Sequence, residues 1–110
     1  MTKRISATDW RQAEWEGMSE REFQEGHVLP LARQFGWAVY HTHDSRRSVA
    51  GFPDIIALRD GRMVVAELKS EKGRLSQPQK EWLDLFRAIP EAEVFVWRPS
   101  DCDQIAEVFI

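Results

Sequence analysis

Apolar residues recur at helical spacing in two stretches of the chain, and each stretch opens with a capping pattern. In the first, Ser19 and Glu22 form a capping-box pair, and Gly36 supplies a C-terminal stop. The pattern predicts an amphipathic helix over residues 20–35. Its apolar positions are Phe23, Val28, Leu31, Ala32 and Phe35.

The second helical stretch opens at Ser76, which pairs with Gln79 in another capping box. Pro90 terminates it, because proline cannot continue a helix. The pattern therefore predicts a helix that follows Ser76 and runs to Ile89. Its apolar positions are Trp82, Leu83, Leu85, Phe86 and Ile89.

Four shorter apolar runs predict strands at residues 37–40, 52–58, 63–68 and 94–97. Between the second and third strands, Asp60-Gly61 favours a tight hairpin, because glycine accepts positive φ without cost. The last run is nearly continuous in apolar residues, which is typical of a strand buried on both faces. A strand, a crossover helix and a returning strand make a right-handed parallel connection. We therefore predict an α/β (α+β) fold whose mixed sheet has an antiparallel hairpin at one side and a parallel pair inside, flanked by helices.

The ends of the chain carry weaker helical patterns. Ser6 and Thr8 can cap a short helix. Residues 1–18 are thus predicted to be an N-terminal helical extension, and residues 19–110 a single domain. At the other end, a final helical turn is predicted to lead into Ile105.

Composition narrows the class of protein. The chain has 110 residues and one cysteine, Cys102, which lies between two acidic residues and is therefore structural or incidental. No apolar run approaches the roughly 20 residues needed to span a bilayer, so we expect a cytoplasmic protein without membrane association. The net charge is -3, but residues 41–80 carry +3 and the remainder -6. This asymmetry permits a polyanionic partner without proving one.

Three charged residues lie at strand ends that the predicted sheet brings together. Because side chains alternate across a strand, Glu67 and Lys69 point to one face. Asp54 is six residues before Asp60, and Glu67 is six after Gly61. An antiparallel hairpin therefore places the two carboxylates opposite one another.

Two carboxylates and the backbone carbonyl of Leu68 form a hard oxygen site of the kind that magnesium prefers. A metal there could polarise a phosphodiester and acidify a bound water, while Lys69 orients that water or offsets charge in the transition state. The alternative is that Asp54 only caps a strand and that Glu67 forms a surface ion pair with Lys69.

Two short motifs carry a resemblance to a known family. Pro53-Asp54, followed by Glu67-Leu68-Lys69, resembles the PD-(D/E)xK signature of restriction-endonuclease-like phosphodiesterases. Gly51-Phe52-Pro53-Asp54 and Gly73-Arg74-Leu75-Ser76, the latter followed by Gln79, are similar to the VRR-NUC branch of that superfamily. The resemblance covers residues 19–98. It implies a restriction-endonuclease-like core of helix, three strands, helix and strand, which is the order that the apolar pattern predicts.

The resemblance also implies an acidic residue on the first helix and a glutamine on the second. Glu20, Glu22 and Glu25 compete for the first role. We favour Glu20, because at 100° per residue it falls near the centre of the apolar face, which Gln24 shares, whereas Glu22 points away. Gln79 matches the glutamine, besides its capping role.

These assignments imply Mg²⁺ or Mn²⁺ as the cofactor. The expected metal ligands are Asp54, Glu67, the Leu68 backbone carbonyl and Glu20. The expected catalytic residues are Asp54, Glu67, Lys69, Gln79 and Glu20.

Polar and basic residues around the acidic site are candidates for phosphate contacts. A zinc site at His41 and His43 is disfavoured, because Cys102 is a poor fourth ligand and the sequence offers no second cluster. The histidines and the residues after them form either a loop that leads into the acidic site or an ordinary polar loop. The candidate nucleic-acid-binding residues are His41, His43, Arg46, Arg47, Ser48, Lys72 and Arg74.

The function implied by the resemblance is that of a Mg²⁺- or Mn²⁺-dependent endodeoxyribonuclease. Small stand-alone VRR-NUC proteins, often from phages or bacteria, look like structure-selective nucleases. Dimeric forms resemble Holliday-junction resolvases, so a homodimer that acts on branched DNA is one alternative. A non-catalytic nucleic-acid-binding module and a purely structural interaction protein are the others. Wide separation of Asp54 and Glu67, or their pairing to other side chains, would favour the last.

Overall fold

A four-stranded mixed sheet lies between two helical layers. The computed structural model describes residues 14–42 and 48–110. In chain order the elements are α1 (Glu20–Phe23), the π-helix η2 (Gln24–Val28), α2 (Leu29–Gln34), β1 (Ala38–His41), β2 (Ile55–Arg59), β3 (Arg62–Leu68), α3 (Gln77–Arg87), β4 (Ala92–Trp97), the 3-10 helix η3 (Pro99–Asp101) and α4 (Cys102–Phe109).

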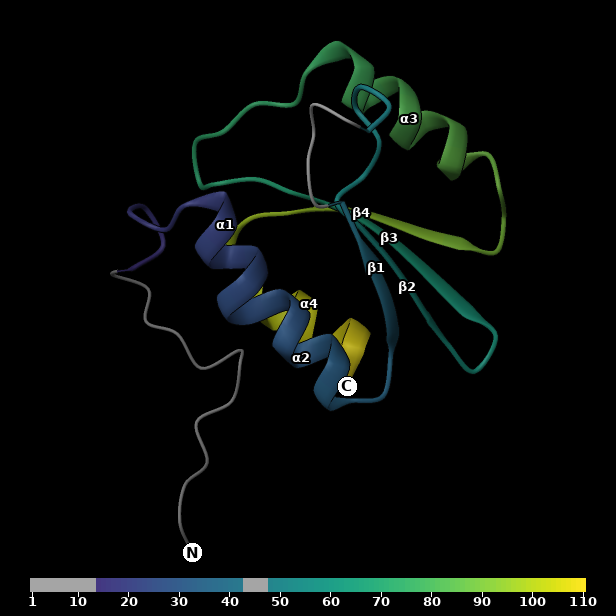
Figure 1. Cartoon of the computed structure of the whole chain (residues 1–110), viewed down its shortest axis with the longest axis horizontal. Helices are drawn as coiled ribbons and strands as arrows, with labels where there is room; N and C mark the ends of the chain where they lie inside the picture. The colour runs from purple at the N-terminus through teal and green to yellow at the C-terminus, as the bar shows by residue number, and fades with distance from the viewer. Residues whose placement is uncertain (1–13, 43–47) are drawn as a thin grey trace, which may run out of the picture.

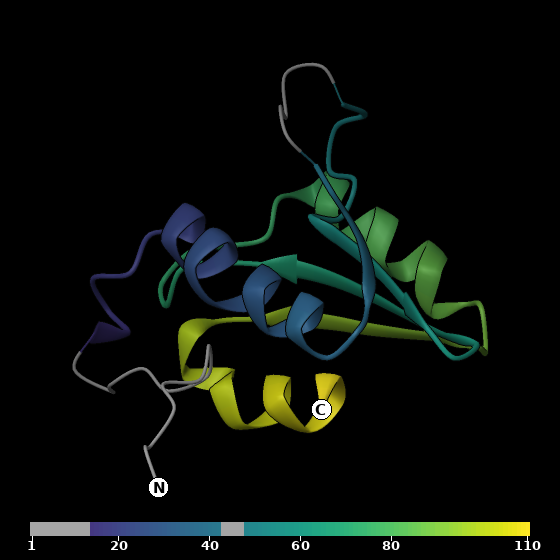
Figure 2. The ribbon, with the colours of Figure 1, turned by 60° about the horizontal axis from the view of Figure 1, so that its bottom comes forward.

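The helices divide unequally between the two faces of the sheet. Figure 1 shows α3 on one face and α1, α2 and α4 on the other. Figure 2 shows α4 lying along the sheet, and α2 and α4 are in contact. This arrangement confirms the predicted α+β fold class. Among the helices of the described residues, none has the length and apolar character required to cross a membrane.

The first predicted helix is present, but its middle turn is a π-helix. In η2 the N–H of Leu29 donates to the carbonyl of Gln24, five residues earlier. Pro30 explains the wider turn, since it has no N–H and its ring would clash with the carbonyl of Gly26 in a regular α-helix. Such π turns are frequent at functional sites.

Both predicted capping boxes, at Ser19 and Ser76, are present. They fix the starts of α1 and α3, because each satisfies backbone N–H groups that a helix start leaves without partners. α3 ends at Arg87 rather than Ile89, since the residue before Pro90 is disfavoured in helical backbone.

The strand order is β1-β2-β3-β4. β2 and β3 are antiparallel and turn at Asp60 (φ 50°) and Gly61 (φ 79°), whereas β3 and β4 are parallel. These pairings confirm the predicted hairpin and the parallel crossover.

Two details of the predicted sheet are wrong. The parallel pair is not inside the sheet, because β4 is an edge strand. Residues 92–96 are only half-buried, and Trp97 alone is fully buried. An edge strand has one strand neighbour, and the helices on the two faces cover it in part, so a continuous apolar run does not guarantee burial on both faces.

The ends of several elements also differ from the pattern: β1 is shifted by one residue, and β4 begins two residues earlier than predicted. β2 begins at Ile55 rather than Phe52, because Pro53 has no N–H to give to a strand ladder. The final helical segment, η3 and α4, is longer than the predicted turn. Ile105 and Phe109 lie one helical turn apart and are both buried, so packing extends the helix.

The predicted N-terminal helix falls largely outside the described residues, which exclude residues 1–13. Residues 15–17 form a turn, which the N–H of Met18 closes by donating to the carbonyl of Trp15 at 3.3 Å. The division of the chain at residue 18 stays a prediction.

The main core lies between the sheet and the layer of α1, α2 and α4. Phe109 packs edge-on against Trp37 and Trp97, with ring centroids 5.3 Å apart in both pairs. The indole Nε1 of Trp37 also donates to the carbonyl of Phe109 at 2.9 Å. The buried residues of this core include Phe23, Val28, Leu31, Trp37, Ile55, Val64, Leu68, Trp97, Ile105 and Phe109.

Cys102 is a half-buried free thiol at the start of α4. Burial and the nearby carboxylate of Asp103 raise its pKa, so the thiol stays protonated at neutral pH. A protonated thiol is a poor nucleophile and a poor metal ligand, which favours a structural or incidental role.

Arg59 ties the C-terminal ends of α2 and α4 to the hairpin. Its Nη1 donates to the carbonyls of Phe35, at 2.9 Å, and Phe109, at 3.0 Å. Its guanidinium lies 4.6 Å from the centre of the Trp37 ring. One cation therefore satisfies carbonyls that the two helix ends leave without intrahelical partners.

Replacement of Arg59 tests this tie. We expect Arg59→Ala to lower the free energy of unfolding by about 1–3 kcal/mol, because the carbonyl of Phe35 loses its donor and the carbonyl of Phe109 keeps only that of Trp37. Urea denaturation measures the change. Arg87→Ala is the control: Arg87 is exposed and pairs with the exposed carboxylate of Asp84, so it should cost less than about 0.5 kcal/mol. Equal losses in the two variants would contradict the tie.

Candidate active site

The β2–β3 register brings Asp54 and Glu67 face to face. Ile55 pairs with Ala66 in the antiparallel ladder, so the next residues outward, Asp54 and Glu67, are opposite one another. This confirms the predicted register. Asp54 then reaches across to β3, where its Oδ2 accepts the N–H of Leu68 at 2.8 Å.

The backbone of Asp54 is held from the other side by the end of β1. The N–H of Thr42 donates to the carbonyl of Asp54 at 3.0 Å, and the Thr42 hydroxyl donates to the carbonyl of Pro53 at 3.2 Å. Asp54 is thus fixed between β1 and β3 before β2 begins.

Glu67 is nearly inaccessible, with 2% of its surface exposed. The amide Nε2 of Gln79 donates to its Oε2 at 2.9 Å, while the amide oxygen of Gln79 accepts the N–H of Ser76 at 2.8 Å. Gln79 therefore both caps α3 and holds Glu67. Its two predicted roles are compatible, because each uses a different atom of the amide.

Gly51 allows α3 to approach the carboxylates. It adopts φ +82°, and a Cβ at this position would lie 2.4 Å from the carbonyl carbon of Pro78 and 2.6 Å from the backbone nitrogen of Gln79. Only a residue without a side chain lets the loop before Asp54 pack against the first turn of α3. That contact sets the distance between Gln79 and β3.

Lys69 follows β3 and is 8% exposed. Its Nζ lies 4.0 Å from Oε2 of Glu67, and its N–H donates to the carbonyl of Trp97 at 2.9 Å. The ammonium group thus adjoins the carboxylate pair. Glu67 and Lys69 are buried and Asp54 is half-buried, unlike the surface ion pair that was the alternative interpretation.

The two carboxylates perturb one another. Burial, the charge of Asp54 and a proton-mediated hydrogen bond to Asp54 raise the pKa of Glu67 to about 9, against the opposing effect of Lys69. Burial also raises the pKa of Asp54, although the N–H of Leu68 opposes it. As a carboxylate, Glu67 has a buried oxygen, Oε1, that no donor in the described structure satisfies. The carboxylate pair therefore lacks enough positive charge and enough hydrogen-bond donors to balance it.

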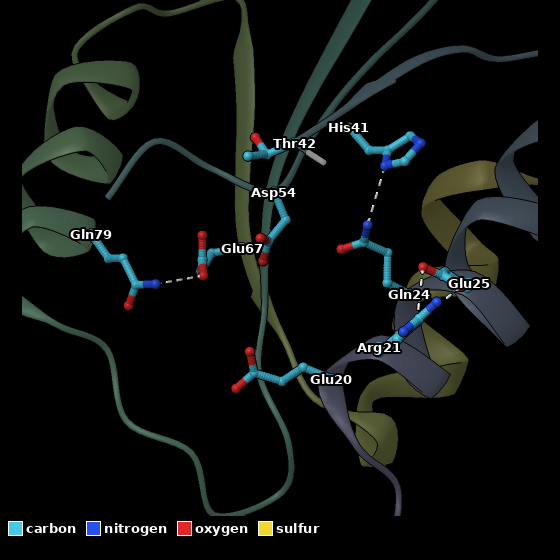
Figure 3. A pocket seen from close by; sticks show the side chains of 9 residues that line it. All are labelled: Glu20, Arg21, Gln24, Glu25, His41, Thr42, Asp54, Glu67 and Gln79. Atoms are coloured by element: carbon cyan, nitrogen blue, oxygen red, sulfur yellow. Dashed lines mark hydrogen bonds and ion pairs between the residues drawn. The ribbon is translucent and has the colours of Figure 1, made fainter. Parts of the chain in front are cut away.

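An open pocket of about 670 Å³ lies in front of the pair (Figure 3). Side chains from α1, η2, β1 and α3 surround it. Its lining residues are Glu20, Arg21, Gln24, Glu25, His41, Thr42, Asp54, Glu67 and Gln79.

The first-helix glutamates separate clearly in the structure. Glu22 caps Ser19, and Glu25 pairs with Arg21 at the rim. Glu20 lines the pocket, where its negative charge contributes to raising the pKa of both Asp54 and Glu67. Glu20 itself is exposed.

Glu20 does not close a ligand cluster with the other two carboxylates. Within residues 14–42 and 48–110, no three Asp, Glu, His or Cys residues converge as a metal-holding group. Asp54 and Glu67 form the core of the candidate site, and the assignment of Glu20 as a ligand stays a prediction.

One contact in the pocket and one lining residue were not predicted. Nε2 of Gln24 lies 3.4 Å from Nδ1 of His41 and so joins η2 to β1. Arg21 brings a cation to the rim. The π turn that sets the direction of Gln24 follows from Pro30, but helical periodicity alone assumes a regular helix.

The predicted phosphate-contacting residues are scattered around the site. His41 lines the pocket, Ser48 is half-buried, and Arg74 is exposed. Lys72 is exposed and pairs with Glu16 at 3.1 Å. The remaining three, His43, Arg46 and Arg47, lie outside the described residues.

Comparison with known proteins gives a consistent family. The model of the VRR-NUC domain family matches residues 3–98. A solved structure described as a VRR_NUC domain aligns with a TM-score of 0.56 and 26% sequence identity, over 79% of this chain and 98% of that chain. No curated protein gives a significant match.

Gly51→Ala tests the approach of α3 to the carboxylates. We expect a loss of about 2 kcal/mol or more in the free energy of unfolding, since the new Cβ would overlap the backbone of Pro78 at an already strained φ. Gly36→Ala is a matched control, with φ +84° but no atom within 4 Å of its Cβ. It should cost about 1 kcal/mol from φ alone. Urea denaturation compares the variants, and equal costs would argue against the close approach.

The raised pKa of Glu67 predicts a pH dependence of stability in metal-free protein. The folded protein keeps a proton up to pH about 9 that the unfolded chain releases near 4.5. Between these values the free energy of unfolding should fall as pH rises, by up to about 1.4 kcal/mol per pH unit.

Glu67→Gln removes this titration. We expect the variant to gain stability relative to the wild type as the pH rises from about 5 to about 9, measured by urea denaturation in EDTA. Glu91→Gln, at an exposed position, controls for the change in net charge. A stability difference that does not change with pH would refute the buried, proton-sharing pair.

Proposed function

The chain belongs to the VRR-NUC domain family, and this membership is consistent with a nuclease module; we propose that it is a Mg²⁺- or Mn²⁺-dependent DNA endonuclease. One observation carries the proposal. Two carboxylates, Asp54 and Glu67, face one another at the end of a pocket, beside the ammonium group of Lys69. Two nearby carboxylates are costly to bury without a cation.

The residues present fit a hard divalent cation. Oε1 of Glu67 accepts no hydrogen bond from the described residues, and the mutual repulsion of the pair raises the pKa of Glu67. Asp54 and Glu67 would hold the ion. The carbonyl of Leu68 is a third candidate ligand, because its N–H points to Asp54 and both main-chain groups of a strand residue face the same edge. When bound, the ion would polarise a phosphodiester and lower the pKa of a coordinated water.

The protein's own groups have distinct roles in this proposal. Gln79 and the N–H of Leu68 each hold one carboxylate, so neither is free to turn away. Lys69 is placed to stabilise the negative charge that develops on the phosphoryl oxygens, or to hold the attacking water. Glu20 adds a negative charge on the opposite wall of the pocket.

We propose DNA as the substrate, with phosphates contacting the basic rim. Arg21 and His41 line the pocket, and Lys72 and Arg74 are exposed on the loop after Lys69. Basic side chains position a nucleic acid through its backbone and read no sequence by themselves. This favours selectivity for DNA structure over sequence. Cutting of a four-way junction as a homodimer is the specific form that the assay below separates from general cleavage.

The proposal is tested on labelled four-way-junction, flap, duplex and single-stranded DNA with Mg²⁺ or Mn²⁺. We expect cutting that EDTA abolishes and that Lys69→Ala lowers by about 100-fold or more, because a buried cation next to the carboxylates is lost. Lys80→Ala, which removes an exposed lysine from α3, is the matched control and should cut normally. Cutting that survives both EDTA and Lys69→Ala would point to a contaminant.

A folded wild type that cuts none of these substrates would overturn the proposed activity. Binding without cutting would then favour the non-catalytic module. The interaction-protein alternative expects Asp54 and Glu67 to lie far apart or to be paired to other side chains. They are opposite one another, which counts against it, whereas the bond from Gln79 to Glu67 is of the second kind, so the cutting assay decides between the two.

A further inference from the structure

The side chain of Arg98, which directly follows β4, holds the backbone of the β3–α3 loop (residues 69–76). Its Nη1 donates to the carbonyls of Ser70 at 2.6 Å and Gly73 at 2.7 Å, with a longer contact to the carbonyl of Glu71 at 3.3 Å. Three carbonyls of one loop thus converge on one nitrogen. Such convergence fixes a loop that has no helical or strand pairing of its own.

The same loop is tied to the chain after β4 by a second contact. The N–H of Ser100 donates to the carboxylate of Glu71 at 3.0 Å. Arg98 is itself held, because its N–H donates to Oδ2 of Asp101 at 2.8 Å. At the start of the loop, the N–H of Lys69 donates to the carbonyl of Trp97. The loop therefore follows the end of β4 as a rigid extension of the sheet.

This loop forms one side of the candidate active site. A Cβ at Gly73 would lie 3.2 Å from Oε2 of Glu20 and 3.5 Å from Cδ of Lys69. The backbone that Arg98 grips is therefore packed against both of these side chains. The loop also carries Lys72 and Arg74, which are two of the expected phosphate contacts.

We propose that Arg98 is a positioning residue of the active site: it holds the β3–α3 loop so that Lys69 and Glu20 keep their places beside the carboxylate pair. The inference rests on the proposed nuclease function. An arginine suits the task, because its Nη1 lies one bond further from the backbone than the ammonium nitrogen of lysine and because its charge is permanent.

Arg59 offers a matched control for a merely structural role. It also donates from Nη1 to backbone carbonyls, those of Phe35 and Phe109. Arg59 is the last residue of β2, however, and lies opposite the first residue of β3, next to the hairpin turn. Arg98 directly follows Trp97, which pairs with Leu68 at the other end of β3. Arg59→Ala thus removes the same kind of contact away from the site.

The experiment compares wild type, Arg98→Ala and Arg59→Ala by hydrogen exchange and by DNA cutting. We expect faster amide exchange in residues 70–76 of Arg98→Ala but not of Arg59→Ala. With the preferred DNA substrate, Arg98→Ala should lower kcat by about 10- to 100-fold, because small displacements of catalytic groups reduce the rate steeply. Arg59→Ala, assayed well below its melting temperature, should keep the wild-type kcat.

Chemical rescue separates positioning from stability. Millimolar guanidinium chloride, compared with equal sodium chloride, should restore part of the kcat of Arg98→Ala and leave Arg59→Ala unchanged. Arg98→Lys should remain slow, since the lysine side chain ends one bond short of the position of Nη1 and so loses the close contacts to the loop carbonyls.

The outcomes distinguish the inference from the function on which it rests. A wild type that cuts no DNA overturns the nuclease proposal, and with it any role of Arg98 in catalysis. A wild type that cuts while Arg98→Ala cuts equally fast, or exchanges its loop amides at the wild-type rate, overturns the positioning role alone. Equal loss of kcat in Arg98→Ala and Arg59→Ala would also overturn it, since both would then act through stability.

Discussion

The antiparallel register between β2 and β3 determines nearly everything about the site. Because Ile55 pairs with Ala66, Asp54 lies opposite Glu67. Beyond the last backbone pair, the side chain of Asp54 takes the place of a backbone acceptor for the N–H of Leu68. A slip of one residue would turn Glu67 to the other face of the sheet. The tight turn at Asp60 and Gly61 and the buried residues of both strands prevent that slip.

A fixed register alone would leave the two carboxylates with unfavourable energy. Glu67 is buried and Asp54 half-buried, the two repel one another, and Lys69 compensates only at 4.0 Å. The surrounding structure therefore has to hold them in place against their own repulsion. Gln79 does so from α3, which can approach only because Gly51 has no side chain. The carboxylate pair thus lowers the stability of the fold at the place where the proposed reaction needs negative charge, as is common at functional sites.

Local sequence signals were sufficient for much of this arrangement. Side-chain alternation and the Asp-Gly turn predicted the facing of Asp54 and Glu67, and the capping pattern at Ser76 located Gln79 at the start of α3. Both signals are short-range and physical. The motif resemblance added an acidic residue on the first helix, and helical periodicity chose Glu20, which does line the pocket.

Tertiary context decided what those signals could not. The burial of β4 depends on its place at the sheet edge, which an apolar run does not reveal. The π turn before Pro30 changes the direction of the helix face that carries Gln24. The contacts of Arg98 join residues more than twenty positions apart, and nothing in the local sequence around it marks such a partner.

Arg59 and Arg98 use one chemical device at the two ends of β3. Each guanidinium group collects backbone carbonyls that no helix or strand partner satisfies. At the hairpin end the carbonyls belong to helix termini, and the contact holds the core together. At the other end they belong to the loop beside Lys69, and the same contact sets the shape of the site. A small domain can thus order an irregular active-site loop without adding another element of secondary structure, because one half-buried cation replaces the pairing that the loop lacks.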